Sequence, residues 1–218
     1  MSGILIAAAL AACAAAQEPA PSPAAPTAPS LMPPCDPSTA SWRVLATEAD
    51  RRRLRDWRQA WTGALEQARA GGHAEEIARE GALLEPDVAL TEPTPPPGDY
   101  DCRTIKLGTP SPDLLVYVPY PAFRCRIAVD GDRMTFTKLS GSQRPIGRLF
   151  GDVDRRMIFL GTIQLGDEGR SYQYGIDAER DMIGVLERIG EQRWRLVFPY
   201  PHFESLLDVI ELVPAASR

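Results

Sequence analysis

Few residues of this chain have types and spacings that suit catalysis. The two histidines, His73 and His202, lie far apart, and no pair of cysteines or histidines has the spacing of an ordinary zinc site. His202, Ser205 and Asp208 are close in sequence, but no Gly-x-Ser-x-Gly motif, Ser-x-x-Lys motif or glycine-rich phosphate loop occurs. The sequence therefore predicts no catalytic residue, no metal site and no cofactor, and a hydrolase that uses the His202/Ser205 loop is the alternative.

A five-residue motif that occurs twice is the stronger signal. Residues Pro119–Phe123 read PYPAF and residues Pro199–Phe203 read PYPHF. Proline fixes φ and removes a backbone donor, so we expect both copies to be loops that present Tyr120 and Tyr200 on a stiff backbone. Tyrosine supplies rigid, amphipathic contact area, which suits binding. The alternative is that these rings only fill one end of the fold.

The N-terminus has the pattern of an export signal. The apolar run Ile4–Ala16 is too short to span a bilayer, and a polar, proline-rich stretch follows it. Within it, Leu10–Cys13 (LAAC) resembles a bacterial lipobox, in which the cysteine becomes the lipidated first residue, while Ala14–Ala16 offers a competing cleavage site before Gln17. We expect export to the periplasmic side of a bacterial envelope, with a lipid on Cys13 as the only attachment to the outer membrane.

Composition divides the chain into four parts. After the signal region of residues 1–16, residues 17–41 are rich in Pro, Ala, Ser and Thr and are expected to be a disordered tether. Residues 42–97 combine helical periodicity with a proline-rich linker, and residues 98–214 alternate like strands. The net charge is −5 and acidic residues are mixed among the arginines throughout, so we expect no nucleic-acid partner.

The helical part predicts a hairpin of two helices. Thr47 with Asp50 three residues later forms a helix start, and an apolar stripe then continues to the glycines Gly71 and Gly72. A second, shorter helix is expected from Ala74 to Leu84. It stops before Pro86, because the residue that precedes a proline avoids helical geometry.

The second half predicts an antiparallel meander of about eight strands. Their expected ranges are 99–107, 122–129, 133–139, 146–150, 155–165, 182–189, 193–198 and 206–213. The fold class is thus mainly β with N-terminal helices (α+β). We expect a closed or nearly closed small barrel, because closure removes the exposed edge strands. An open antiparallel sheet with the helices covering one side is the alternative.

In such a meander the connections after odd-numbered strands emerge at one end. These are the longer connections, whereas the even-numbered strands are followed by tight glycine turns. The longer connections carry a predicted binding set for a ligand or partner: Tyr120, Ser142, Arg144, Tyr172, Tyr174, Tyr200 and His202. The guanidinium of Arg144 could hold an anionic or carbonyl group.

The sequence also predicts a disulfide and a buried ion pair. Cys102 and Cys125 lie in the first two expected strands, and an exported chain meets an oxidising compartment, so we expect a disulfide between them. Two buried free thiols are the alternative, and Cys35 is left over in the tether. Glu187 alternates in phase with Val185 and Ile189, which predicts that it points inward as the buried partner of an arginine.

Several segments together carry a family resemblance. They are GDYDCRTIKLG, FRCRI, KLSGSQRPIGRLF, FLGT, RDMIGVLERIG and RWRLVFPYPHFESLLDVIELVP, preceded by ADRRRLRDWRQAW. As a set they resemble a family of exported bacterial proteins, the domain-of-unknown-function family DUF4893, from about Trp42 to Pro214. Because the family has no assigned activity, the resemblance implies no catalytic role.

The layout of the chain is also similar to that of bacterial periplasmic protease-inhibitor lipoproteins, in which a cysteine-bridged barrel follows a lipobox. The N-terminal helices depart from that layout. The sequence therefore favours a non-catalytic binding or interaction module tethered in the envelope, with an unknown small ligand or an envelope protein as its partner. A periplasmic protease inhibitor and a hydrolase are the alternatives.

Overall fold

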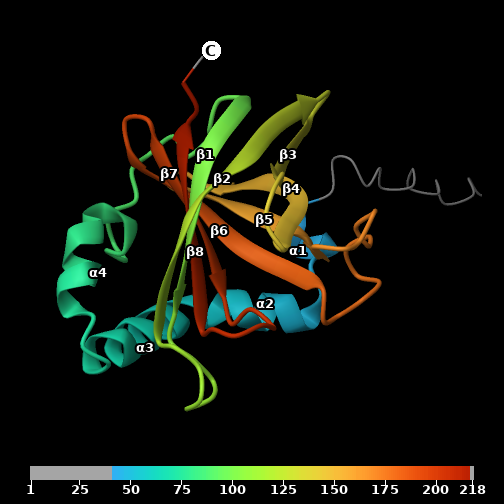
Figure 1. Ribbon diagram of the computed structural model, residues 1–218. Helices are drawn as coiled ribbons and strands as arrows, with labels where there is room; N and C mark the ends of the chain where they lie inside the picture. The colour runs from blue at the N-terminus through green and yellow to red at the C-terminus, as the bar shows by residue number, and fades with distance from the viewer. Residues whose placement is uncertain (1–40, 217–218) are drawn as a thin grey trace, which may run out of the picture. The chain divides into compact units, whose positions relative to one another are not determined.

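The computed structural model describes residues 41–216, and Figure 1 shows how their helices and strands are arranged. The predicted signal region, Cys13, Cys35 and the predicted tether as far as residue 40 lie outside the described residues. The helices are α1 (Trp42–Leu45), α2 (Glu48–Arg55), α3 (Trp57–Ala70) and α4 (Ala74–Glu80), followed by a 3₁₀ turn at Gly81–Leu83. The strands are β1 (Gly98–Leu107), β2 (Tyr117–Asp130), β3 (Arg133–Lys138), β4 (Gln143–Val153), β5 (Arg156–Leu165), β6 (Asp181–Gly190), β7 (Arg193–Pro199) and β8 (Leu207–Pro214).

The strands form one closed barrel in which each strand is antiparallel to the next. β1 closes the barrel by pairing with both β2 and β8, so that Leu107 has Tyr117 on one side and Leu207 on the other. This confirms the predicted closed meander of eight strands. The alternative of an open sheet is wrong, because the first and last strands pair and leave no edge.

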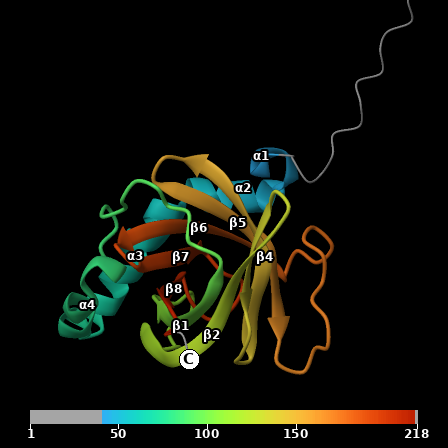
Figure 2. The ribbon, with the colours of Figure 1, turned by 90° about the horizontal axis from the view of Figure 1, so that it is seen from above.

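Where the helices cover the barrel wall, the side chains on both its inner and its outer face are buried. The barrel interior holds one core, which includes Phe136, Phe159 and Leu196. A second core lies outside the wall, where α3 and α4 pack on the outer side chains of β1, β7 and β8. Near the N-terminus, Trp42 and Leu54 pack on the outer face of β5 and β6. Figure 2 shows α2 and α3 along β6 and β7, with α4 beside α3.

The helices follow the sequence pattern with two corrections. The Thr47 side chain accepts a hydrogen bond from the Asp50 backbone N–H, which confirms the predicted helix start. The expected single helix is interrupted at Asp56, which separates α2 from α3. The second helix ends at Glu80 because Gly81 has a φ of 54°, and only the short 3₁₀ turn continues. None of the helices in residues 41–216 has the length and apolar character needed to cross a membrane.

The first copy of the repeated motif is part of a strand, which corrects the expectation of a loop. β2 begins at Tyr117, and Pro119 lies opposite Ile105 of β1. β2 pairs with β3 only from Cys125 onward, so its first residues have β1 as their neighbour on one side, next to a register shift in β1. An edge position beside an irregularity is the setting in which a strand tolerates proline.

The connections divide between the two ends of the barrel as predicted. Two-residue turns join β2 to β3, β4 to β5 and β6 to β7, and Gly131 in the first of them has a φ of 60°. The other connections are residues 108–116, 139–142, 166–180 and 200–206. We call the end that carries these four connections the loop end, and the opposite end the turn end.

Cys102 and Cys125 form the predicted disulfide between β1 and β2. Their Cα atoms are 5.9 Å apart. The two residues are diagonal neighbours, since Cys102 lies opposite Phe123 and Cys125 lies opposite Tyr100. Both cysteines are fully buried in the interior core, so the bond joins the wall from inside the barrel.

An aromatic stack crosses the barrel interior. The Phe159 ring makes edge-to-face contacts with Phe136 at 6.0 Å and with Phe198 at 5.3 Å between ring centroids. Gly184 leaves room for it, because a Cβ atom there would lie 2.9 Å from the Phe198 ring. The stack fills part of the barrel interior.

Candidate functional site

A cavity of about 120 Å³ lies inside the barrel at the loop end, and every strand or its adjoining loop contributes to its lining. The polar lining residues are Thr104, Lys106, Tyr120, Lys138, Ser142, Gln143, Glu204 and Asp208. The apolar ones are Phe123, Pro145, Ile163, Met182, Phe198 and Ile210. Phe198 of the aromatic stack is therefore part of the cavity floor. Small-molecule sites are usually concave and combine apolar surface with converging polar groups, and this cavity is more polar than most of them.

Both lysines of the protein line this cavity. The chain has 24 basic residues, of which only Lys106 and Lys138 are lysines and 22 are arginines. Lys106 is in phase with the inward-facing Cys102 on β1, and Lys138 is in phase with the inward-facing Phe136 on β3. Strand alternation therefore directs both long side chains into the barrel. The sequence analysis missed them, although their rarity and their phase were both visible.

Lys106 has carboxylate partners. Its Nζ atom lies 2.9 Å from Asp208 Oδ2 and 3.6 Å from Glu204 Oε2. Burial lowers the pKa of Lys106, but the attraction of Asp208 and its hydrogen bond outweigh this, so the pKa lies above its ordinary value. The second oxygen of Asp208 accepts a hydrogen bond of 2.5 Å from the Ser205 hydroxyl. Lys106 and Asp208 thus form a buried ion pair in which each charge neutralises the other.

Lys138 is held differently. Its Nζ donates to the Gln143 carbonyl at 2.9 Å and lies 3.9 Å from the centroid of the Phe123 ring. Among the described residues no carboxylate forms an ion pair with it. Burial, followed by the nearby charge of Lys106, lowers the pKa of Lys138 to about 8. A buried ammonium that has three donors and uses one on a carbonyl is an incompletely satisfied cation.

Thr104 adds a second unsatisfied group to the same cavity. Its side chain belongs to a residue that is 8% exposed, and within the described part of the chain its hydroxyl has no hydrogen-bond partner. Buried hydroxyl groups are nearly always hydrogen-bonded, because leaving one unpaired costs about 1–3 kcal/mol. Thr104 is thus a second polar group in the same cavity as Lys138 that is incompletely satisfied within the described part of the chain.

The structure brings part of the predicted binding set to this cavity. Tyr120 and Ser142 line it, and His202 lines a smaller adjoining cavity that shares Lys106 and Asp208 with the first. The Nδ1 atom of His202 lies 3.6 Å from Glu179 Oε2. These residues keep the location that the sequence indicated, and their role in binding stays a prediction.

Arg144 lies outside the barrel wall, so it does not serve the cavity as expected. Its guanidinium donates to the backbone carbonyls of Gly141 at 2.8 Å and Leu165 at 2.9 Å, and reaches that of Glu168 at 3.5 Å. Arg144 therefore clamps two connections of the loop end together. The alternation of β4 explains this, since Gln143 and Pro145 face the cavity and the residue between them faces away.

The other three tyrosines of the predicted set also lie elsewhere. Tyr172 is 48% exposed and its ring lies 6.0 Å from the Arg180 guanidinium. The Tyr174 hydroxyl donates to Asp50 and accepts from the Thr47 N–H at 2.9 Å. Tyr200 packs its ring on the core outside the wall. The two copies of the motif thus reach the same end of the barrel, but their tyrosines face opposite sides of the wall.

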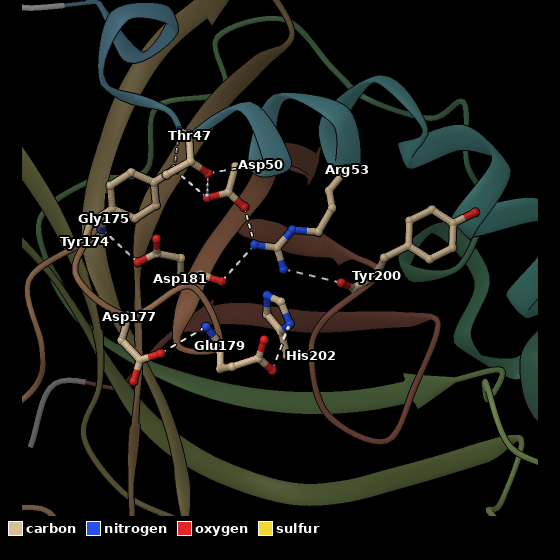
Figure 3. Close-up of polar contacts among 10 residues, drawn as sticks. All are labelled: Thr47, Asp50, Arg53, Tyr174, Gly175, Asp177, Glu179, Asp181, Tyr200 and His202. Atoms are coloured by element: carbon tan, nitrogen blue, oxygen red, sulfur yellow. Dashed lines mark hydrogen bonds and ion pairs between the residues drawn. The ribbon is translucent and has the colours of Figure 1, made fainter.

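A polar network between α2 and the loop end explains the positions of Tyr174 and Tyr200 (Figure 3). Arg53 pairs with the fully buried Asp50 and donates to the carbonyls of Asp181 at 2.8 Å and Tyr200 at 3.4 Å. Figure 3 shows the Tyr200 ring pointing away from His202, on the far side of its own backbone. The network fastens the first helices to the barrel, which is a structural role.

The candidate hydrolase residues do not form a triad. The Ser205 hydroxyl donates to Asp208 and lies near the Phe203 carbonyl, whereas His202 pairs with Glu179. No hydrogen bond joins Ser205 to His202 among residues 41–216, so the serine has no general base in this arrangement. The same part of the chain contains no group of three or more His, Cys, Asp or Glu residues that could hold a metal ion.

These features define a class of protein, an eight-stranded antiparallel barrel with helices on one outer side and a small, lysine-lined cavity at one end. The profile of the family described as "Domain of unknown function (DUF4893)" matches residues 42–212. The chain belongs to this family, which confirms the resemblance seen in the sequence. No match was found among curated proteins or among solved structures.

Proposed function

We propose that this protein is an exported, lipid-anchored module that binds a small ligand in the loop-end cavity without chemically changing it. The observation that carries the proposal is the placement of the only two lysines of an arginine-rich chain inside one cavity, with Lys138 and Thr104 incompletely satisfied. Polar groups of this kind reduce stability, and proteins retain them where a ligand uses them.

Binding has more support than hydrolysis. The Ser205 hydroxyl is committed to Asp208, and Lys106 compensates that carboxylate, so both side chains support the cavity wall. Neither group is free to activate water or a nucleophile. We therefore favour a module that holds its ligand, as the scarcity of catalytic motifs in the sequence also indicates.

The proposed location rests on the sequence and on the disulfide. The apolar run Ile4–Ala16 and the lipobox-like Leu10–Cys13 support export and lipid attachment. The Cys102–Cys125 bond supports an oxidising compartment, since disulfides persist there and are rare in reducing ones. Palmitate incorporation by the full-length protein in a bacterial host, and its loss in Cys13→Ser, tests the anchor.

Native mass spectrometry of the protein purified from its bacterial host tests the binding function. We expect a small bound mass that dissociates on activation. Ser142 is an exposed residue on the rim of the cavity, so Ser142→Trp should block the entrance and remove the bound mass without straining the core. Asp132→Trp, at an exposed turn position on the opposite end, is the matched control and should retain it. A wild-type protein without a bound mass, or a Ser142→Trp variant that keeps it, would contradict the proposal.

A further inference from the structure

We propose that the ligand carries a carboxylate, which Lys138 and Thr104 hold inside the cavity, and a short apolar body. This inference rests on the proposed binding function and specifies the chemical class of the ligand. It follows from three properties of the cavity: its charge, its two incompletely used hydrogen-bonding groups and its apolar lining.

The buried part of the cavity carries one uncompensated positive charge. Lys106 and Asp208 form a pair at 2.9 Å, and each side chain is at most 11% exposed. Glu204 lies farther from Lys106, and its side chain is 51% exposed, so water screens it. Lys138 has no carboxylate partner in the described part of the chain. A ligand with one negative charge would neutralise the cavity.

Two hydrogen-bonding groups of the cavity lining are incompletely used. Lys138 uses one donor on the Gln143 carbonyl, and the Thr104 hydroxyl has no partner among the described residues. Both oxygens of Asp208 already accept hydrogen bonds, from Lys106 and Ser205. A carboxylate offers two strong acceptor oxygens, which matches the two groups in the cavity that lack acceptors.

The lining favours a carboxylate over a phosphate or a cation. Lysines can also bind phosphate, but phosphate sites usually add guanidinium forks or helix N-termini to balance a charge near −2, and this cavity has neither among its lining residues and only one lysine without a carboxylate partner in the described part of the chain. A cationic ligand would be repelled by Lys138. Phe123, Met182 and Phe198 provide apolar surface in the same cavity as Lys138 and Thr104. These side chains fit an aliphatic or aromatic body attached to the carboxylate.

The ionisation of Lys138 gives the inference a pH signature. The titratable and charged groups around this side chain are Lys106, Tyr120, Arg144, Glu204 and Asp208. Burial lowers the pKa of Lys138 to about 8, so the cavity is charged at neutral pH and loses that charge as the pH rises. The affinity for a carboxylate should therefore fall above pH 8, and the affinity for a neutral analogue should not.

Isothermal titration calorimetry of the whole protein with hexanoate, hexanamide and hexylamine tests the ligand class. We expect hexanoate to bind at least about tenfold more tightly than hexanamide at pH 7, and hexylamine to bind most weakly. Lys138→Met should bring the affinities for hexanoate and hexanamide to within about twofold of each other. Thr104→Val, which keeps the shape, should weaken hexanoate binding by about threefold to tenfold.

Arg133→Met is the matched control. It removes a cation from the same strand, β3, at an exposed position outside the barrel, and should leave the preference for hexanoate unchanged. Equal binding of hexanoate and hexanamide, a preference that survives Lys138→Met, or no binding of hexanoate would each overturn the carboxylate assignment. The small mass bound in native mass spectrometry would still stand in those cases, so the two proposals fail separately.

Discussion

The two faces of the barrel wall each bury a basic side chain, and they do so in opposite ways. Arg195 points outward from β7, under the segment that follows α4, and is fully buried. It pairs with Glu187 at 2.7 Å, and its guanidinium lies 4.5 Å from the centroid of the Trp61 ring. The guanidinium also donates to four backbone carbonyls, those of Ala82, Leu83, Glu85 and Pro86.

Lys138, by contrast, points inward and has one carbonyl and one ring as partners among the described residues. This difference in the number of partners corresponds to two roles of a buried cation. A guanidinium that satisfies many carbonyls holds segments together, as Arg195 does between the wall and the helical layer. An ammonium left partly unsatisfied in a cavity weakens the fold and remains available to a ligand.

The largest effect is expected from Arg195→Leu. This change leaves Glu187 buried without a partner and removes the donor from four carbonyls, so the free energy of unfolding should fall by about 3–5 kcal/mol. Thermal unfolding followed by circular dichroism measures it, with a drop in Tm on the order of 10 °C. The double variant Arg195→Leu/Glu187→Leu should recover part of the loss. A loss below about 1 kcal/mol would show that the two cations do not differ as described.

A smaller effect of opposite sign is expected from Lys138→Met. Burial lowers the pKa of Lys138 from its ordinary 10.5 to about 8, so between these values the unfolded chain binds more protons than the folded one. Stability of the wild-type protein should therefore rise with pH across this window, and the burial penalty is complete below pH 8. At pH 7, Lys138→Met should raise the Tm by roughly 2–4 °C.

The gain from Lys138→Met should shrink as the pH rises from 8 toward 10.5, because the folded protein then holds a neutral lysine and the free-energy cost of releasing its proton falls as the pH approaches the pKa of the unfolded chain. Thermal unfolding of both proteins at pH 7 and pH 9.5 measures this change. A variant that is less stable than wild type at pH 7 would mean that Lys138 has a structural role like that of Arg195.

The smallest effect is expected on the solvent-facing outer surface of β1 and β2. Arg126 pairs with Asp99 at 2.6 Å, but both side chains are about half exposed. Arg126→Ala should change the free energy of unfolding by less than about 0.5 kcal/mol and leave ligand binding unaltered. Denaturant unfolding of the wild-type protein and of Arg126→Ala measures this change in the free energy of unfolding. A loss comparable to that of Arg195→Leu would mean that burial is not the property that separates these cations.

Much of the fold could be read from the chain because its signals are local. Short strand-like segments separated by turn residues located all eight strands, and glycines in or near the two-residue turns marked the hairpins. The positions of Cys102 and Cys125 in the first two expected strands indicated the bond between them. The partnership of Glu187 with an arginine was also predicted correctly. Its direction was not, since Glu187 faces the helical layer outside the wall and not the barrel interior.

Only the tertiary structure decided on which face of the barrel wall each side chain lies. β6 is buried along nearly its whole length, because the interior core covers one face and the helices cover the other. A pattern of burial cannot separate the faces of a strand that is buried on both. For the same reason Tyr120 and Tyr200, in two copies of one motif, looked alike in sequence and lie on opposite faces. By itself, the sequence determined the strands and their order. The ion pair of Lys106 with Asp208, by contrast, depends on the closure of the barrel, because only the pairing of β1 with β8 brings these two residues, 102 positions apart, together.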